Sequence, residues 1–198
     1  RRVGQYDVLG ALGSGAEATV FEGHQPNLDR PVALKMLSHA LVHKESFADR
    51  FGREARIIAQ LDHEHIVKVY DCVEDWGTQF IVMEKLSGTL LEDIVLDKSR
   101  TLAWGATRRI LKEVCLGLAH SHAQGLLHRD IKPSNVFLTQ DRRVKILDFG
   151  IALEQGDGEQ DPNSLVGTPY YMAPERILGK SADGRSDLYS VGIMAYEM

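Results

Sequence analysis

The sequence predicts an α+β fold in two parts, a strand-rich part followed by a mainly helical one. In the first third of the 198 residues, short β-rich runs alternate with turn residues. Further on, apolar residues recur with helical spacing along Thr107–Ala123. Between these regions, around Glu84–Thr89, the pattern loosens at Ser87-Gly88, which indicates a linker between two lobes.

The individual elements follow from the same patterns. In the first part, strands are expected at Tyr6–Leu12, Thr19–Gly23, Val32–Met36, Val67–Cys72 and Gln79–Met83. A helix is expected at Ser46–Leu61, because its apolar residues form one stripe. In the second part, the expected elements besides Thr107–Ala123 are short strands at Asn135–Leu138 and Val144–Leu147 and a closing helix at Asp187–Met198.

Composition places the chain among globular proteins and excludes several classes of function. With 43% hydrophobic residues and a formal net charge of −5, it has enough apolar material for a core and lacks the basic footprint of nucleic-acid binding. No apolar run approaches the roughly 18 residues of a membrane helix, so no membrane segment is expected in this stretch. Cys72 and Cys115 suit a reducing compartment, although one disulfide between them stays open. We expect a cytoplasmic location, with a membrane anchor outside this stretch left open.

A glycine-bearing turn lies between the first two predicted strands, in the segment Leu12–Val20. Gly13 and Gly15 would let backbone N–H groups approach phosphate oxygens without an intervening Cβ. A simple hairpin turn explains the same glycines. A dinucleotide-binding fold is disfavoured, because the β-branched run Thr19-Val20-Phe21 follows the glycines where that fold needs a helix.

A lysine and a glutamate form a candidate ion pair. Lys35 lies on a predicted strand, where most lysines simply reach solvent. Glu54 lies on the apolar stripe of the next predicted helix, where burying a carboxylate is costly unless it is paired. A Lys35–Glu54 pair would relieve both charges.

The densest polar cluster is His128–Asn135, which lies between apolar runs. As a surface loop it would be unremarkable. However, Asp148 also follows a short apolar strand, and Asn135 and Asp148 together offer oxygen ligands of the kind that Mg²⁺ prefers. Asp130 would then be available to orient a hydroxyl, and Lys132 to neutralise charge on a transferring phosphoryl group.

These motifs, taken in order, resemble the signature of the eukaryotic-type (Hanks-type) protein kinases. The matching segments are Gly13–Val20, Val32–Lys35, His128–Asn135, Asp148–Gly150 and Ala173–Glu175. Lys132 and the segment Gly167–Tyr171 resemble the corresponding residues of the Ser/Thr branch, and the sequence Ile66–Tyr70 is similar to that of bacterial members.

The resemblance implies a two-lobed protein kinase fold. Residues 1–83 would form an antiparallel-sheet N-lobe with one regulatory helix, 84–89 the hinge, and 90–198 a mainly helical C-lobe. Because the chain opens on Arg1 and ends on Met198 in mid-pattern, we expect a piece of a longer protein, truncated within the closing helix of an incomplete C-lobe. Glu175 would then lack the arginine with which it pairs in such kinases.

The same resemblance implies the ligands and their residues. The cofactors would be ATP and Mg²⁺, with Mn²⁺ as an alternative metal, held by Asn135 and Asp148. Lys35 would bind the α- and β-phosphates with Glu54 holding it, Asp130 would accept the substrate hydroxyl's proton, and Lys132 would touch the γ-phosphate. The implied nucleotide-binding residues are Leu12, Gly13, Ser14, Gly15, Val20, Ala33, Lys35, Met83, Glu84, Leu86 and Phe137.

Further positions are implied to support and regulate the site. Asp187 would anchor the backbone of the catalytic loop, which is the segment His128–Asn135, and His128, Phe149 and Ile58 would stack in an apolar column. Phosphate on Ser164 or Thr168 is expected to order the activation loop through Arg129 and Arg50; Ser164 as an ordinary polar loop residue is the alternative.

The implied activity is transfer of the γ-phosphoryl group of ATP to Ser or Thr hydroxyls of proteins, with autophosphorylation in the activation loop. Protein substrates are the expected partners, and a second copy acting in trans is another. A pseudokinase that binds nucleotide as a scaffold is the alternative, although Lys35, Asp130 and Asp148 are all present. A small-molecule phosphotransferase ranks lower, because Gly167–Glu175 resembles a peptide-holding segment. The histidines at 63, 65, 120 and 122 are interpreted as structural.

Overall fold

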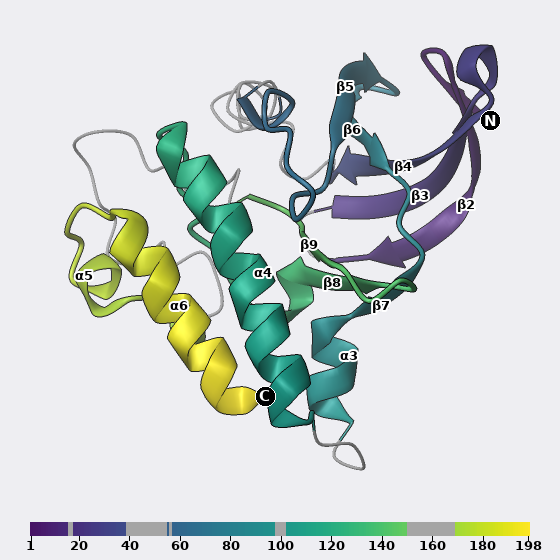
Figure 1. Cartoon of the computed structure of the whole chain (residues 1–198). Helices are drawn as coiled ribbons and strands as arrows, with labels where there is room; N and C mark the ends of the chain where they lie inside the picture. Colours follow the sequence, from purple (N-terminus) through teal and green to yellow (C-terminus); the bar gives the residue numbers. More distant parts are fainter. Residues whose placement is uncertain (16–17, 39–54, 56, 98–101, 150–168) are drawn as a thin grey trace. The chain divides into compact units, whose positions relative to one another are not determined.

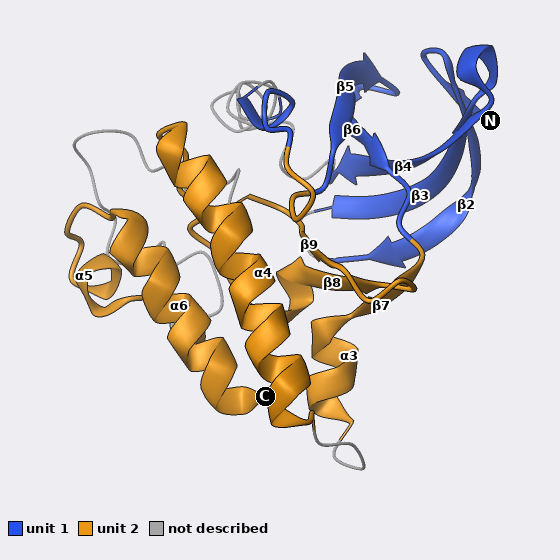
Figure 2. Cartoon of the chain, in the orientation of Figure 1, with its two compact units in different colours: residues 1–62, 67–86 blue, residues 63–66, 87–198 orange. Residues whose placement is uncertain are grey.

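The computed structural model describes residues 1–15, 18–38, 55, 57–97, 102–149 and 169–198 (Figure 1). The chain divides into two compact units (Figure 2). The first comprises Arg1–Asp62 and Val67–Leu86, and the second comprises His63–Ile66 and Ser87–Met198. The short segment at 63–66 therefore belongs with the second unit, although both of its neighbours in sequence belong to the first.

The first unit is an antiparallel sheet with strand order β1-β2-β3-β4-β6-β5. The strands are β1 (Arg2–Val3), β2 (Tyr6–Ser14), β3 (Ala18–Gln25), β4 (Arg30–Leu37), β5 (Val69–Asp75) and β6 (Thr78–Glu84), with the short helix η1 (Pro26–Leu28) between β3 and β4. All strands predicted in this part are confirmed. The two residues of β1 are too few to carry a pattern, and they were not predicted.

One face of this sheet carries the core of the unit. Leu34 on β4 and Phe80 and Val82 on β6 are fully buried, and they pack with Val3 and Tyr6. The Tyr6 hydroxyl donates to a carboxylate oxygen of Asp71 at 2.9 Å, which satisfies the one polar atom of an otherwise buried ring. Since side chains alternate along a strand, residues 33 and 35 project from the opposite face.

The helix predicted at Ser46–Leu61 is described only at its end. Residues 55, 57 and 58 are helical, and Ala59 N–H donates to the carbonyl of Ala55 at 2.9 Å. Ala55 and Ile58 are buried. The earlier part of the predicted helix, including Arg50 and Glu54, lies outside the described residues.

The second unit combines a small sheet with helices. The antiparallel sheet β7-β8-β9 consists of β7 (Gly88–Leu90), β8 (Val136–Thr139) and β9 (Val144–Ile146). The α-helices are α3 (Leu91–Leu96), α4 (Trp104–Ala123), α5 (Pro174–Ile177) and α6 (Gly184–Glu197), and the short 3₁₀ helices are η2 (Pro133–Asn135) and η3 (Pro169–Tyr171). Figure 1 shows α6 running beside α4, and the two helices are in contact.

Helix α4 buries the face that its sequence predicts. Ile110, Val114 and Leu118 are at most 1% exposed, which confirms the helical stripe. They form the core of the unit together with Ile146 on β9 and Met194 on α6, which are also fully buried. Among the described residues, no helix combines the length and apolar character needed to cross a membrane.

Strand β7 begins inside the stretch where the sequence pattern loosens. Gly88 has φ +154°, and a Cβ there would come within 2.0 Å of the backbone oxygen of Leu138 on β8. Only glycine permits this approach, and it pairs Gly88 with Thr139. Gly88, one of the two residues that suggested a linker, is therefore the first residue of strand β7. The strand was not predicted, because the close contact of Gly88 with β8 is not visible in the local sequence.

Candidate active site

The strand register of the first unit gathers predicted nucleotide-binding residues on one face. Val20 on β3 pairs with Lys35 on β4, and Ala33 on β4 pairs with Met83 on β6. Directly paired residues of antiparallel strands project to the same side, as do residues two apart on one strand. Val20, Ala33, Lys35 and Met83 therefore share the face opposite the core.

The glycine-bearing turn closes a hairpin next to this face. Gly13 pairs with Val20, and Gly15 N–H donates to the carbonyl of Ala18 at 2.9 Å. The hydroxyls of Ser14 and Thr19 lie 3.2 Å apart across the hairpin. The interpretation as strand, turn and strand is confirmed, and Leu12, Gly13 and Ser14 all lie on β2.

The end of β6 is held on two sides. The backbone N–H of Glu84 donates to the carbonyl of Lys68 at 2.9 Å, and the side chain of Glu84 accepts from Lys68 N–H at 2.8 Å. The ammonium of Lys85 forms an ion pair with the carboxylate of Glu22 on β3. Glu22 pairs with Ala33 and so projects from the same face as the predicted nucleotide-binding residues. The backbone leading to Leu86 is thereby fixed within the first unit.

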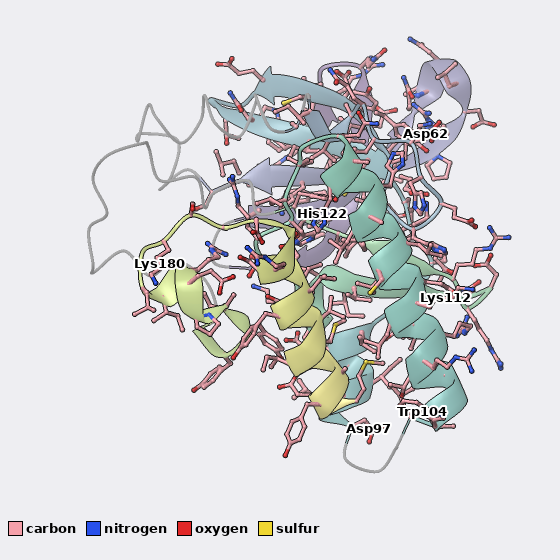
Figure 3. The ribbon with its side chains drawn as sticks, turned by 60° about the vertical axis from the view of Figure 1, so that its left-hand side comes forward. Asp62, Asp97, Trp104, Lys112, His122 and Lys180 are labelled. Carbon is pink, nitrogen blue, oxygen red and sulfur yellow. The ribbon has the colours of Figure 1, made fainter. Side chains whose placement is uncertain are left out.

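In the second unit, the loop at 128–135 is anchored by a buried carboxylate. Asp187 on α6 is 1% exposed and accepts from the backbone N–H groups of His128 at 2.9 Å and Arg129 at 2.8 Å. The ring nitrogen Nε2 of His122, on α4 (labelled in Figure 3), lies 2.7 Å from the same carboxylate and donates to it, because a carboxylate only accepts. The expectation that Asp187 anchors the catalytic loop is confirmed.

His128 is a fully buried member of this loop, and its hydrogen bonds define its tautomer. Its Nδ1 accepts from the backbone N–H of Asp130 at 3.3 Å, so Nε2 carries the proton and donates to the carbonyl of Leu147 at 2.8 Å. Burial lowers the pKa of His128, which keeps the ring neutral. The ring lies against Phe149, with centroids 4.6 Å apart. This contact confirms the stacking predicted for these two residues.

Asp130 is held by two neighbours. Asn135 Nδ2 donates to the backbone oxygen of Asp130 at 2.7 Å and to its carboxylate at 2.9 Å. The ammonium of Lys132 lies 2.8 Å from the same carboxylate oxygen. The carboxylate is about a quarter exposed, so it is fixed in position yet accessible to a substrate.

The donor set fits a magnesium ion. Because the Nδ2 group of Asn135 donates to Asp130 twice, its amide orientation is fixed, and Oδ1 is the atom that would serve as a ligand. Asp148 follows β9 with φ 42°, and Leu147 N–H donates to the carbonyl of Asn135 at 2.9 Å, which joins the two ligand-bearing segments. A pair of oxygen ligands suits Mg²⁺, which keeps several waters and binds substrate phosphates.

Two contacts around this loop had no signal in the sequence. The guanidinium of Arg176 on α5 donates to the backbone oxygen of Arg129. The Ser186 hydroxyl donates to the Glu175 carboxylate at 2.5 Å, and this bond lowers the pKa of Glu175. Glu175 was expected to lack its usual arginine, and among the described residues it accepts this bond from Ser186 on α6 instead. These pairs come from different elements, which no local pattern connects.

The predicted site residues divide between the two units. The first unit carries Leu12, Gly13, Ser14, Gly15, Val20, Ala33, Lys35, Met83, Glu84 and Leu86, and the second carries Arg129, Asp130, Lys132, Asn135, Phe137 and Asp148. Glu54, Arg50, Ser164 and Thr168 lie outside the described residues. The Lys35–Glu54 pair and the phosphate-binding role of Arg50 and Arg129 stay predictions.

The histidines at 63, 65 and 120 form a separate group in the second unit. The rings of His63 and His120 have centroids 5.0 Å apart, and His65 Nδ1 lies 3.2 Å from the carbonyl of Val144. Burial, followed by the neighbouring histidines, lowers the pKa of His63. Among the residues that the structure describes, no three His, Cys, Asp or Glu side chains converge as a metal site would require.

Comparison with known proteins shows the family to which the chain belongs. The family model "Protein kinase domain" matches residues 6–198. A probable serine/threonine-protein kinase of Streptomyces coelicolor is 40% identical over 202 residues, which cover 98% of this chain and 30% of that protein. The serine/threonine-protein kinase PknL of Mycobacterium tuberculosis is 37% identical over 195 residues, covering 98% of this chain and 49% of PknL. The chain thus spans less than half the length of these relatives.

Among solved structures, the PknI kinase domain of Mycobacterium tuberculosis superimposes with a TM-score of 0.82 at 34% identity, covering 98% of this chain and 72% of that domain. The predicted fold is confirmed, with an antiparallel-sheet N-lobe and a mainly helical C-lobe. The resemblance to bacterial Ser/Thr kinases is confirmed by the same relatives. On the family match over residues 6–198, the chain belongs to the protein kinase domain family.

Proposed function

We propose that this chain is the catalytic domain of a Ser/Thr protein kinase, which transfers the γ-phosphoryl group of ATP to Ser and Thr hydroxyls of proteins. The observation that carries the proposal is the placement of Asp130. Its carboxylate is held by Asn135 at 2.9 Å and Lys132 at 2.8 Å, in a loop anchored by Asp187. Phosphoryl transfer needs mainly such positioning and charge stabilisation.

In this proposal the predicted catalytic and metal-binding residues of the second unit have separate roles. Asp130 orients the substrate hydroxyl and accepts its proton, and Lys132 neutralises charge on the transferred group. Asn135 and Asp148 hold Mg²⁺ or Mn²⁺. The metal ion, when bound, neutralises charge on the triphosphate so that a neutral hydroxyl can approach.

The first unit is proposed to hold the nucleotide. Lys35 binds the α- and β-phosphates, and Glu54 holds Lys35. The adenine ring packs against Val20 and Ala33, together with Phe137 of the second unit, and its polar edge bonds the backbone at Glu84 and Leu86. Met83 limits the pocket behind the adenine, and the hairpin at Leu12–Gly15 covers the phosphates. The shared face of Val20, Ala33, Lys35 and Met83 supports this assignment.

Regulation and location are proposed on the same basis. Phosphate on Ser164 or Thr168, added by a second copy in trans, orders the activation loop through Arg129 and Arg50. A cytoplasmic location is supported by Cys72 and Cys115, both of which are thiols rather than disulfide partners.

The test is incorporation of labelled phosphate from [γ-³²P]ATP by the complete protein that carries this chain. We expect autophosphorylation on Ser or Thr in the wild type and loss of it in Lys35→Met and Asp130→Asn. Lys112→Met and Asp141→Asn are the matched controls, because both residues are exposed and neither is among the predicted site residues. A wild type that binds ATP without incorporating phosphate would instead support the pseudokinase alternative.

A further inference from the structure

We propose that Arg176 is a positioning residue, which joins the end of the proposed peptide-holding segment to the catalytic loop through the backbone oxygen of Arg129. The inference rests on the proposed function. It assigns a role to Arg176, which lies outside the sequence motifs from which that function was predicted. The carrying observation is the hydrogen bond from Arg176 Nη1, on α5, to the carbonyl of Arg129.

The accepting carbonyl belongs to a strained residue of the loop. Arg129 has φ 68°, a left-handed conformation that a non-glycine residue adopts only when its surroundings hold it there. Asp187 holds the residue through its N–H at 2.8 Å, and Arg176 holds it through its C=O. The strained residue immediately precedes Asp130, so the two contacts together fix the direction in which the chain enters Asp130.

Arg176 completes a set of backbone contacts along this loop. The N–H groups of His128 and Arg129 donate to Asp187, the N–H of Asp130 donates to His128, and the C=O of Asp130 accepts from Asn135. The C=O of Arg129 completes the series, and Arg176 supplies its donor. A carbonyl left without a donor in this half-buried loop would cost free energy.

The element that carries Arg176 is itself fixed to α6. Ser186 donates to Glu175 at 2.5 Å, and Ser190 donates to the carbonyl of Tyr171 at 2.7 Å. The catalytic loop is fixed to the same helix through Asp187. Residues 169–177 and the catalytic loop are thus both bonded to α6, and Arg176 also bonds them directly to each other. A displacement of residues 169–177 is therefore transmitted to the backbone next to Asp130.

The surroundings of the guanidinium favour this role over that of a solvated surface arginine. It is half-buried, and burial, followed by the charge of Arg129, lowers its pKa. The carboxylates of Asp130, Asp187 and Glu175 act in the opposite direction. An arginine suits the position, because its planar guanidinium stays charged when desolvated and offers several donors in a fixed geometry.

The kinetic test compares Arg176→Met and Arg176→Lys with the wild type in the complete protein. Arg176→Met keeps the apolar stem and removes the donor. We expect kcat to fall about tenfold, corresponding to one lost charge-assisted hydrogen bond, while KM for ATP changes less than about twofold. Arg176→Lys should restore part of kcat. Arg185→Met is the matched control, because Arg185 is exposed and pairs only with neighbouring Asp183 among the contacts described.

A second measurement keeps this inference separate from the proposed function. Hydrogen–deuterium exchange of the peptide covering residues 126–132 should be faster in Arg176→Met than in the wild type and unchanged in Arg185→Met. If the wild type is active, an unchanged kcat in Arg176→Met overturns the inference. If the wild type has no kinase activity, the proposed function fails on that result, and exchange alone decides the contact: unchanged exchange overturns it, and faster exchange supports it.

Discussion

Replacing Asp187 with Asn should destabilise the protein far more than the small chemical change suggests. The carboxylate is 1% exposed and accepts three hydrogen bonds, at 2.9 Å from His128 N–H, 2.8 Å from Arg129 N–H and 2.7 Å from His122 Nε2. An asparagine amide presents one oxygen, so its NH₂ group must face at least one of these donors. A buried donor left without an acceptor costs about 1–3 kcal/mol.

The remaining bonds also weaken, because they lose their charged acceptor. Charge-assisted hydrogen bonds are about twice as strong as neutral ones, so two weakened bonds add about 1–2 kcal/mol. The free energy of unfolding of Asp187→Asn should therefore fall by about 2–5 kcal/mol, as measured by urea denaturation. The activity should fall with it, because the same N–H groups position the loop that carries Asp130.

Asp183→Asn is the matched control for this experiment. Asp183 lies on the same helix as its N-cap and accepts from Arg185 N–H at 2.8 Å in an exposed position. Asparagine caps helices as well as aspartate does, so the stability of this variant should barely change. If Asp187→Asn is no more destabilised than Asp183→Asn, the anchoring role assigned to Asp187 is wrong.

Three further predictions test other parts of the structure. Burial keeps His128 neutral in the folded state, whereas in the unfolded state it takes up a proton below the ordinary histidine pKa of about 6.5. The contribution of neutral His128 to the free energy of unfolding is therefore fully present above about pH 6.5. Below that pH it declines by up to about 1.4 kcal/mol per pH unit. Urea denaturation between about pH 7 and pH 5 should show a flatter dependence in His128→Phe, and an equal slope would contradict this. Lys85→Met should raise KM for ATP about three- to tenfold, by releasing the segment that Glu22 holds, and exchanging the two charges should restore it; unchanged KM would argue against the ion pair. Gly88→Ala should lower Tm, because its Cβ would lie 2.0 Å from a backbone oxygen of β8, whereas Gly105→Ala on α4 meets no atom within 4 Å and should not.

Local patterns in the sequence were sufficient for most of the secondary structure. The strands from Tyr6 to Glu84 and the helix α4 follow from period-two and helical spacing, and both are confirmed. The contacts of Asp187 and the stacking of His128 on Phe149 are also confirmed, but these came from the family resemblance. Spacing alone could not connect positions separated by so many residues.

What the sequence could not predict depends on contacts between distant elements. Gly88 reads as a linker residue unless its approach to β8 is known. The Ser186 hydroxyl that binds Glu175 and the Lys85–Glu22 pair each join residues on different elements. Arg176 comes directly after the motif Ala173–Glu175 in the sequence, yet none of the neighbouring residues indicates that its guanidinium reaches the backbone of Arg129. Such pairs require the tertiary structure, because their partners carry no periodic signal.

The central claim of the proposed function is that one Mg²⁺-bound nucleotide binds Lys35, Asn135 and Asp148. The most direct measurement is a crystal structure of the protein with Mg²⁺ and a non-hydrolysable ATP analogue. We predict Lys35 at the α- and β-phosphates and Asn135 and Asp148 as ligands of the metal, with Asp130 facing the γ-phosphate. A complex in which the nucleotide lies away from Lys35, or in which Asp148 does not bind the metal, would contradict the account.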